Sequence, residues 1–374
     1  MPSNLTIEQI LKKEGERYLP LLQHVLRKSD PDFTFPGDTN ERIAAMRLAI
    51  LARNVFLFNE LEELMNTCSK AGIETILLKG AMMEGIYPAG LRPFADIDFL
   101  IRQEKLAQVE GILGSLGYRS FSRELRHGAE DFQCEAQYLK KGRMSFIVEP
   151  HWILGSPYPY ASRVRIEGLW QRAQEANVAS LNTLVLSPED SILHACLHLF
   201  RHNIGGWLAS ACDIAELTHH YEGKLDWEAF LSWVFEFRLC LPVRYSLQRT
   251  VQLFHPPVPG FVLSELASCK TARIEQLFFA LLTSTNNDEP QGRRFLAELL
   301  SMPGARLKFR RFLLLLFPSG KFMLSYYAVS RPGLLPLYYV LHWKNAFITA
   351  LKAVFSVARN IVHFYSIFRK SQRC

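Results

Sequence analysis

The stretch Phe94-Ala95-Asp96-Ile97-Asp98-Phe99-Leu100-Ile101 decides the fold. Successive side chains of a β-strand point to opposite faces, so this stretch would place Asp96 and Asp98 on one face, roughly 7 Å apart. Ile97, Phe99 and Ile101 would face the other way. Two carboxylates among apolar neighbours repel each other and lose hydration, which is costly unless a cation lies between them. The pattern therefore predicts a buried strand with a cation site on one face.

The flanking sequence predicts an α/β unit around this strand. The apolar run Ile76-Leu77-Leu78 ends at Lys79-Gly80, which indicates a strand followed by the start of a helix. We expect a helix over residues 104–116 and further strands over residues 118–121, 135–140 and 144–151, the last two joined by a turn at Lys141-Gly142-Arg143.

Helical periodicity dominates on both sides of this unit. Apolar residues recur at helical spacing before residue 71, and Ser187-Pro188-Glu189-Asp190 is typical of a helix start. Further helices are expected over residues 213–221, 227–237, 242–254 and 261–283. The predicted fold class is therefore α+β, a mixed sheet with N-terminal helices and a large helical C-terminal region. We divide the chain into an N-terminal helical segment (1–71), an α/β core (72–180), a helical domain (181–300) and a basic, aromatic-rich helical region (301–374).

The composition is that of a globular protein with a basic charge balance. Of 374 residues, 49% are hydrophobic and 21% charged, which argues against long disordered arms. The net charge of +7 suits an anionic partner such as a nucleotide, a nucleic acid or an acidic membrane surface. The seven cysteines form no C-x-x-C pair and no signal-peptide pattern opens the chain, so we expect unpaired thiols in the reducing cytoplasm.

The C-terminal region combines apolar runs with cations. Residues 345–368 are about as long as a membrane span, but Lys352, Arg359 and His363 share one face of the expected helix. An amphipathic helix, packed on the core or lying on the inner face of the membrane, fits better than a transmembrane one. The cations of residues 306–311 could bind nucleic acid or lipid headgroups, but no recognition-helix or base-stacking pattern accompanies them.

Several further residues are candidates for a phosphoryl-transfer site. Magnesium prefers one or two protein carboxylates with phosphate oxygens and water, so Asp96 and Asp98 suit it. Glu149 ends an apolar strand and is a third metal ligand or a general base. In this interpretation Lys79 contacts a phosphate, Gly80 allows close backbone approach, and Arg92 neutralises the leaving diphosphate. His151 lies two residues beyond Glu149 and is either part of the site or a hydrogen-bonded structural residue.

Two other patterns have competing interpretations. His194, His198 and His202 recur every four residues along one helix face, which suggests zinc, but the outer pair would lie about 12 Å apart on a straight helix and cannot reach one ion. A structural role or contact with substrate remains for them. Asp213 either caps a helix or faces a cleft between the α/β unit and the helices.

These motifs together resemble a known family. The strand-Lys79-Gly80-helix segment, Gly90-Leu91-Arg92-Pro93 before the acidic strand, and an acid followed by His151-Trp152 are similar to the uncharacterised bacterial nucleotidyltransferase family of the DNA polymerase β-like superfamily. The resemblance continues through residues 186–190, 197–198 and 212–214. It implies a nucleotidyltransferase-type mixed-sheet core, a nucleoside triphosphate donor such as ATP, and Mg²⁺ or Mn²⁺ held by Asp96, Asp98 and Glu149.

One departure from the family pattern leaves two functions open. Lys79-Gly80-Ala81 stands where the superfamily usually has Gly-Ser or Gly-Gly, so a hydroxyl that often touches a phosphate is missing. The leading hypothesis is a magnesium-dependent nucleotidyltransferase that moves a nucleoside monophosphate to an unidentified acceptor. The alternative is a non-catalytic protein of the same fold, which senses nucleotide or assists assembly at a membrane. The missing hydroxyl favours the alternative, and the three acids favour the enzyme.

Overall fold

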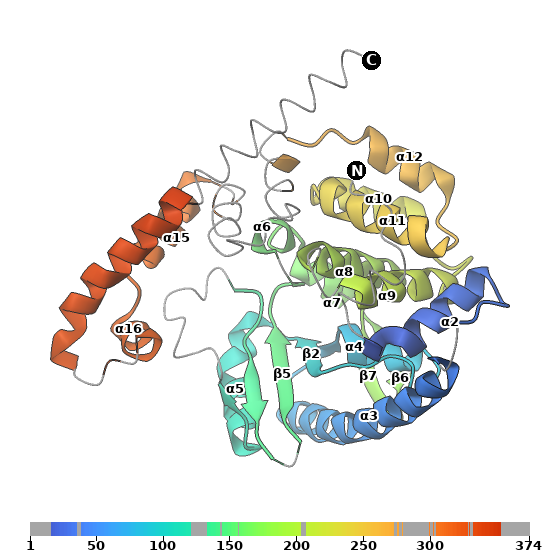
Figure 1. Ribbon diagram of the computed structural model, residues 1–374, viewed down its shortest axis with the longest axis horizontal. Helices are drawn as coiled ribbons and strands as arrows, with labels where there is room; N and C mark the ends of the chain where they lie inside the picture. Colours follow the sequence, from blue (N-terminus) through green and yellow to red (C-terminus); the bar gives the residue numbers. More distant parts are fainter. Residues whose placement is uncertain are drawn as a thin grey trace. The chain divides into compact units, whose positions relative to one another are not determined.

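The computed structural model divides the chain into two compact units (Figure 1). The first unit covers residues 1–121 and 134–270, and the second covers the remainder. The structure describes residues 16–35, 39–120, 133–142, 144–155, 157–202, 207–272, 304–327 and 332–352, with a few single positions between 275 and 329. The division into four sequence segments stays a prediction.

The first unit contains a seven-stranded mixed sheet with the order β3-β4-β5-β2-β1-β7-β6. The pairs β2–β5 and β1–β7 are parallel and the other neighbours are antiparallel. The fold is therefore α+β, as predicted. The strands are β1 (Ile76–Leu77), β2 (Asp96–Leu100), β3 (Arg119–Ser120), β4 (Tyr138–Lys140), β5 (Phe146–His151), β6 (Gln174–Val178) and β7 (Leu181–Val185).

The register of the two central parallel strands sets the acidic face. Asp98 of β2 lies opposite Glu149 of β5, and Leu100 lies opposite His151. Because side chains alternate along each strand, Asp96, Asp98, Glu149 and His151 share one face of the sheet. On the other face, Ile97, Phe99 and Ile101 are fully buried, which confirms the predicted alternation.

Helices cover the sheet and form most of the first unit. Ser187 caps α8 by accepting a hydrogen bond from the Asp190 backbone, as the sequence predicts. The helix α9 is buried over nearly its whole length between its neighbours, which explains its apolar sequence. The main helices are α2 (Leu19–Ser29), α3 (Thr39–Lys70), α4 (Lys79–Met82), α5 (Leu106–Ser115), α6 (Tyr158–Ala161), α7 (Ile166–Arg172), α8 (Pro188–Arg201), α9 (Trp207–His220), α10 (Trp227–Glu236), α11 (Cys240–Phe254) and α12 (Gly260–Ser268).

Three expectations about this unit are wrong. The helix predicted over residues 213–221 already begins at Trp207. The helix predicted over residues 261–283 ends at Ser268, and residues 269–272 are not helical. Cys240 and Cys269 are not unpaired thiols, because they form a disulfide that ties the start of α11 to the end of α12. The cytoplasmic location, which depended partly on unpaired thiols, stays a prediction.

The second unit contains α15 (Ala305–Leu316), α16 (Gly320–Tyr326) and a helix over residues 335–352. His342 and Trp343 hydrogen-bond to the carbonyl oxygens of Leu315 and Leu316 at 2.8 and 2.6 Å, so the last helix packs along the end of α15. The helix predicted over residues 345–368 already begins at residue 335 and is described up to residue 352, and its remainder lies outside the described residues. Among the helices in the described ranges, none has both the length and the apolar character that a membrane crossing requires.

Candidate functional site

A cavity of about 610 Å³ opens in the first unit above the acidic face of the sheet. Asp96 and Asp98 of β2 border it, together with residues from α3, α4, α8 and α9. Its polar lining has both signs of charge. The charged and histidine residues that line it are Arg17, Arg53, Lys79, Arg92, Asp96, Asp98, His194, His198, His202 and Asp213.

Asp98 is the most buried acid of this face, with 1% of its surface exposed. Its Oδ1 accepts hydrogen bonds from Lys79 Nζ at 2.8 Å and from His151 Nε2 at 2.9 Å. Burial alone would raise the pKa of Asp98, but the Lys79 ammonium and the His151 hydrogen bond outweigh burial and hold this pKa well below its usual range. Asp98 is therefore ionised and already has a cationic partner.

The turn from β1 into α4 brings Lys79 to this position. Lys79 has a φ of +47°, a left-handed conformation that is uncommon outside glycine. The next residue must be glycine, because a Cβ at Gly80 would lie 2.6 Å from the Cβ of Phe94. The close approach that the sequence predicts at Gly80 is thus made to the chain just before β2, and Gly80 also borders the cavity. The turn directs the Lys79 ammonium to the acidic face.

Asp96 and Glu149 lack the compensation that Asp98 has. The negative charge of Asp98, with burial, raises the pKa of Asp96 to about 6. Burial, with the charges of Asp98 and Glu135, raises the pKa of Glu149 to about 9. Gln137 donates a hydrogen bond to Glu149 at 2.7 Å and fixes the orientation of its carboxyl group. The face therefore carries more acid than Lys79 neutralises.

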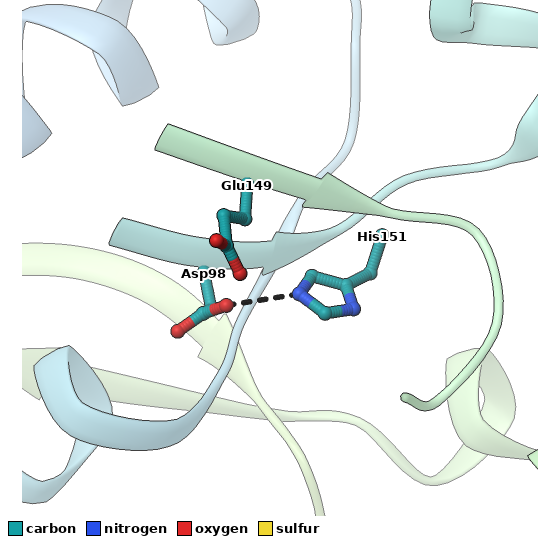
Figure 2. Close-up of side chains that lie close together, drawn as sticks. All are labelled: Asp98, Glu149 and His151. Carbon is teal, nitrogen blue, oxygen red and sulfur yellow. Dashed lines mark hydrogen bonds and ion pairs between the residues drawn. The ribbon is translucent and has the colours of Figure 1, made fainter. Parts of the chain in front are cut away.

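A divalent cation fits this surplus of acid. The ligand atoms of Asp98, Glu149 and His151 all lie within 4.8 Å of one another, and Figure 2 shows the three side chains converging from β2 and β5. Two of these residues belong to the predicted ligand set, and Asp96 shares their face. Carboxylate oxygens are the ligands that Mg²⁺ prefers, so the residues present suit such an ion.

His151 links the acidic face to a second acid that the sequence motifs did not mark. The fully buried His151 ring lies between Asp98 and Glu135, whose Oε2 is 3.4 Å from His151 Nδ1. Arg201 of α8 in turn contacts Glu135 at 3.3 Å. Glu135 also pairs with His151 as a backbone bridge. His151 is thus hydrogen-bonded to Asp98 and lies beside Glu135, and its role stays a prediction.

Arg92 and Asp213 form a buried two-point ion pair. Arg92 donates from Nε and Nη2 to the two carboxylate oxygens of Asp213, each at 2.9 Å. Asp213 lies in the middle of α9, so the suggestion that it caps a helix is wrong. The pair joins the loop before β2 to α9. Arg92 thus borders the cavity while its charge is paired with that of Asp213.

His194 and His198 of α8, and His202 just after the helix, all line the cavity. His198 is hydrogen-bonded through Nδ1 to Ser210 Oγ at 2.6 Å, and its ring lies 4.6 Å from that of His202. Burial, with the nearby charge of Lys79, holds the pKa values of His194 and His198 well below the ordinary value, so both rings are neutral. They are not part of the one metal-ligand group in the described part of the chain.

The site thus consists of acids gathered on one face of a mixed sheet, beside a cavity of about 610 Å³. The chain matches the family described as uncharacterised nucleotidyltransferase over residues 14–255, more than half its length, and belongs to that family. The crystal structure of an antigenic nucleotidyltransferase-like protein from Paracoccidioides brasiliensis is also similar, with 13% sequence identity and a TM-score of 0.33 over 60% of this chain and 94% of that chain. No curated protein matches the chain.

Proposed function

We propose that this protein transfers a nucleoside monophosphate from a nucleoside triphosphate, with ATP the expected donor, to an acceptor hydroxyl in a magnesium-dependent reaction. The observation that carries the proposal is the surplus of acid on the β2–β5 face. Burial and the neighbouring acids raise the pKa values of Asp96 and Glu149, so that Glu149 keeps its proton at neutral pH unless a cation takes its place. A buried surplus of this kind costs stability unless an external cation uses it.

The site residues divide into three roles in this proposal. Asp96, Asp98 and Glu149 hold the metal, which when bound would neutralise triphosphate charge and polarise the reacting phosphoryl group. Glu149 also assists the acceptor hydroxyl. His151 positions Asp98 through its 2.9 Å hydrogen bond and lies within reach of the same ion.

The phosphates are attended by Lys79, Gly80 and Arg92, which border the cavity. Arg17 and Arg53 border it as well and add positive charge that no sequence motif indicated. The volume of about 610 Å³ is that of a small-molecule site, since such pockets usually measure roughly 300 to 1,000 Å³. The bound ligand is therefore a small molecule of high negative charge.

The test is a calorimetric titration of each nucleoside triphosphate into the full chain, with Mg²⁺ and with a chelator. We expect binding that requires the metal. The double variant Asp96→Asn, Asp98→Asn should weaken metal-dependent binding by at least roughly tenfold, since losing even an indirect partner of a metal ligand costs that much. Diphosphate release on incubation with candidate hydroxyl acceptors then reports transfer.

The chain offers a matched control in Asp30-Pro31-Asp32, another Asp-x-Asp pair of the first unit. Both acids are exposed and neither lines the cavity. The double variant Asp30→Asn, Asp32→Asn should bind as the wild type does. Metal-dependent binding that survives loss of Asp96 and Asp98 would remove the site. Nucleotide binding without release of diphosphate from the triphosphate, whichever acceptor is added, would favour the nucleotide-sensing alternative.

A further inference from the structure

The C-terminal part of the chain has a charge unlike the rest. Residues 299–374 contain twelve lysines and arginines and no aspartate or glutamate, a formal charge of +12. The whole chain carries +7, so residues 1–298 carry −5. This cationic segment begins beyond residue 255, where the family match ends. It is a feature of this chain that is separate from the proposed transferase site.

The helix over residues 335–352 presents apolar side chains to solvent. Leu337, Val340 and Phe347 are 66%, 59% and 65% exposed, and Lys344 and Leu351 are exposed as well. These five residues recur at spacings of three and four, so they form one stripe along the helix. The stripe is apolar with a cation at its centre.

The opposite face of this helix carries the polar groups and is the packed one. Tyr339 donates a hydrogen bond to the Pro318 carbonyl oxygen at 2.5 Å, and His342 contacts Leu315. Tyr338 packs its ring against Tyr327 at 5.5 Å. A helix that packs in water usually buries its apolar face. Here the hydrogen-bonding face is turned inward and the aliphatic face outward.

The helix α15 repeats this combination. Phe309 and Phe312 of α15, and Phe317 just after its end, are 62%, 43% and 56% exposed. Arg306 and Arg310 are exposed on the same helix. Of the 20 large hydrophobic residues exposed in the described chain, 13 lie between residues 309 and 351. Exposed apolar side chains are therefore concentrated where acids are lacking.

We propose that α15 and the helix over residues 335–352 dock on an anionic phospholipid bilayer. Leucine, phenylalanine and tryptophan side chains suit the acyl boundary, and lysine and arginine suit acidic headgroups. A second copy of the chain fits poorly, because it would bring two segments of +12 together with no acid in either. Nucleic acid fits less well, since Leu337, Val340 and Leu351 make most of the stripe aliphatic and cannot stack on bases.

The test is flotation of the full chain with vesicles of phosphatidylcholine alone and of phosphatidylcholine with phosphatidylglycerol. We expect flotation with the anionic vesicles and about tenfold weaker partitioning into the neutral ones. High salt should abolish this difference, because it screens the attraction to acidic headgroups. The variant Leu337→Gln, Phe347→Gln should lower partitioning by about tenfold or more, since it removes two large side chains from the acyl boundary. The variant Arg306→Gln, Lys344→Gln should remove most of the preference for anionic lipid.

The matched control is Leu48→Gln, Phe56→Gln, which changes two exposed apolar side chains of α3, 69% and 56% exposed, in the first unit. It should float as the wild type does. Equal flotation of the control and the Leu337→Gln, Phe347→Gln variant would overturn the proposal. So would dimerisation or RNA binding that the same variant abolishes while no vesicle is bound. Flotation unchanged in the Asp96→Asn, Asp98→Asn variant would show that membrane docking stands apart from the transferase proposal.

Discussion

The ion pair between Arg92 and Asp213 should contribute strongly to folding stability. The two side chains are 9% and 10% exposed, and two hydrogen bonds of 2.9 Å join them. The substitution Asp213→Ala would leave the guanidinium buried without its partner. Loss of one member of a buried pair costs about 3 to 5 kcal/mol, because the other charge remains out of water. We expect the free energy of unfolding to fall by that amount.

A double-mutant cycle separates this coupling from other effects of each substitution. Urea denaturation of the wild type, Arg92→Ala, Asp213→Ala and the double variant yields the interaction energy between the two side chains. We expect a coupling of about 3 kcal/mol, with the double variant less destabilised than the sum of the single variants. The urea dependence should keep its slope if unfolding stays two-state.

The exposed pair between Arg165 and Glu236 is the matched control for this cycle. Its N–O distance is 3.0 Å, but its side chains are 75% and 43% exposed. Solvent screening should reduce its coupling to below about 1 kcal/mol. If the coupling between Arg92 and Asp213 is equally small, the argument that burial makes this pair strong is refuted.

Two further predictions concern packing and pH. The substitution Gly80→Ala should destabilise the fold by about 1 to 3 kcal/mol, since the new Cβ would lie 2.6 Å from the Cβ of Phe94. The control is Gly111→Ala in the interior of α5, where a Cβ would meet no atom within 4 Å, and it should stabilise the fold by up to about 1 kcal/mol. Thermal melts of both variants measure the two effects. Hydrogen bonds from His24 and Lys28 outweigh burial and lower the pKa of Glu216. The stability that Glu216 contributes is therefore fully present above its ordinary pKa of 4.5, and it is lost as the pH falls through the lowered pKa. The substitution Glu216→Gln should cost about 2 kcal/mol in urea at pH 7 and less at pH 4, and an equal cost at both would contradict the linkage.

Local patterns in the sequence predicted the centre of the fold. The alternation in residues 94–101 and the apolar run before Glu149 identified the two strands that lie side by side as β2 and β5. The Ser187 motif predicted the start of α8. These signals are readable because side-chain period and helix capping depend on residues a few positions apart.

Other features depend on contacts that no local pattern records. The β6–β7 hairpin turns at Ala179-Ser180, both with positive φ, without the glycine or asparagine that usually marks such a turn. Arg92 finds Asp213 across 121 residues, and the disulfide joins cysteines 29 residues apart. The partnership of Glu135 with His151 likewise forms only when the sheet assembles.

The balance of charge distinguishes which site residues act on a ligand and which shape the cavity. Asp213 satisfies Arg92, so that pair mainly fixes the loop before β2 against α9. Burial keeps His194 and His198 neutral, so they offer polarity without charge. On the acidic face, by contrast, the single Lys79 ammonium serves the ionised Asp98 while the pKa values of Asp96 and Glu149 stay raised. A cation from outside the chain would remove that imbalance and free Lys79 for a phosphate, which is why the acids and the lysine are more informative about function than the arginine.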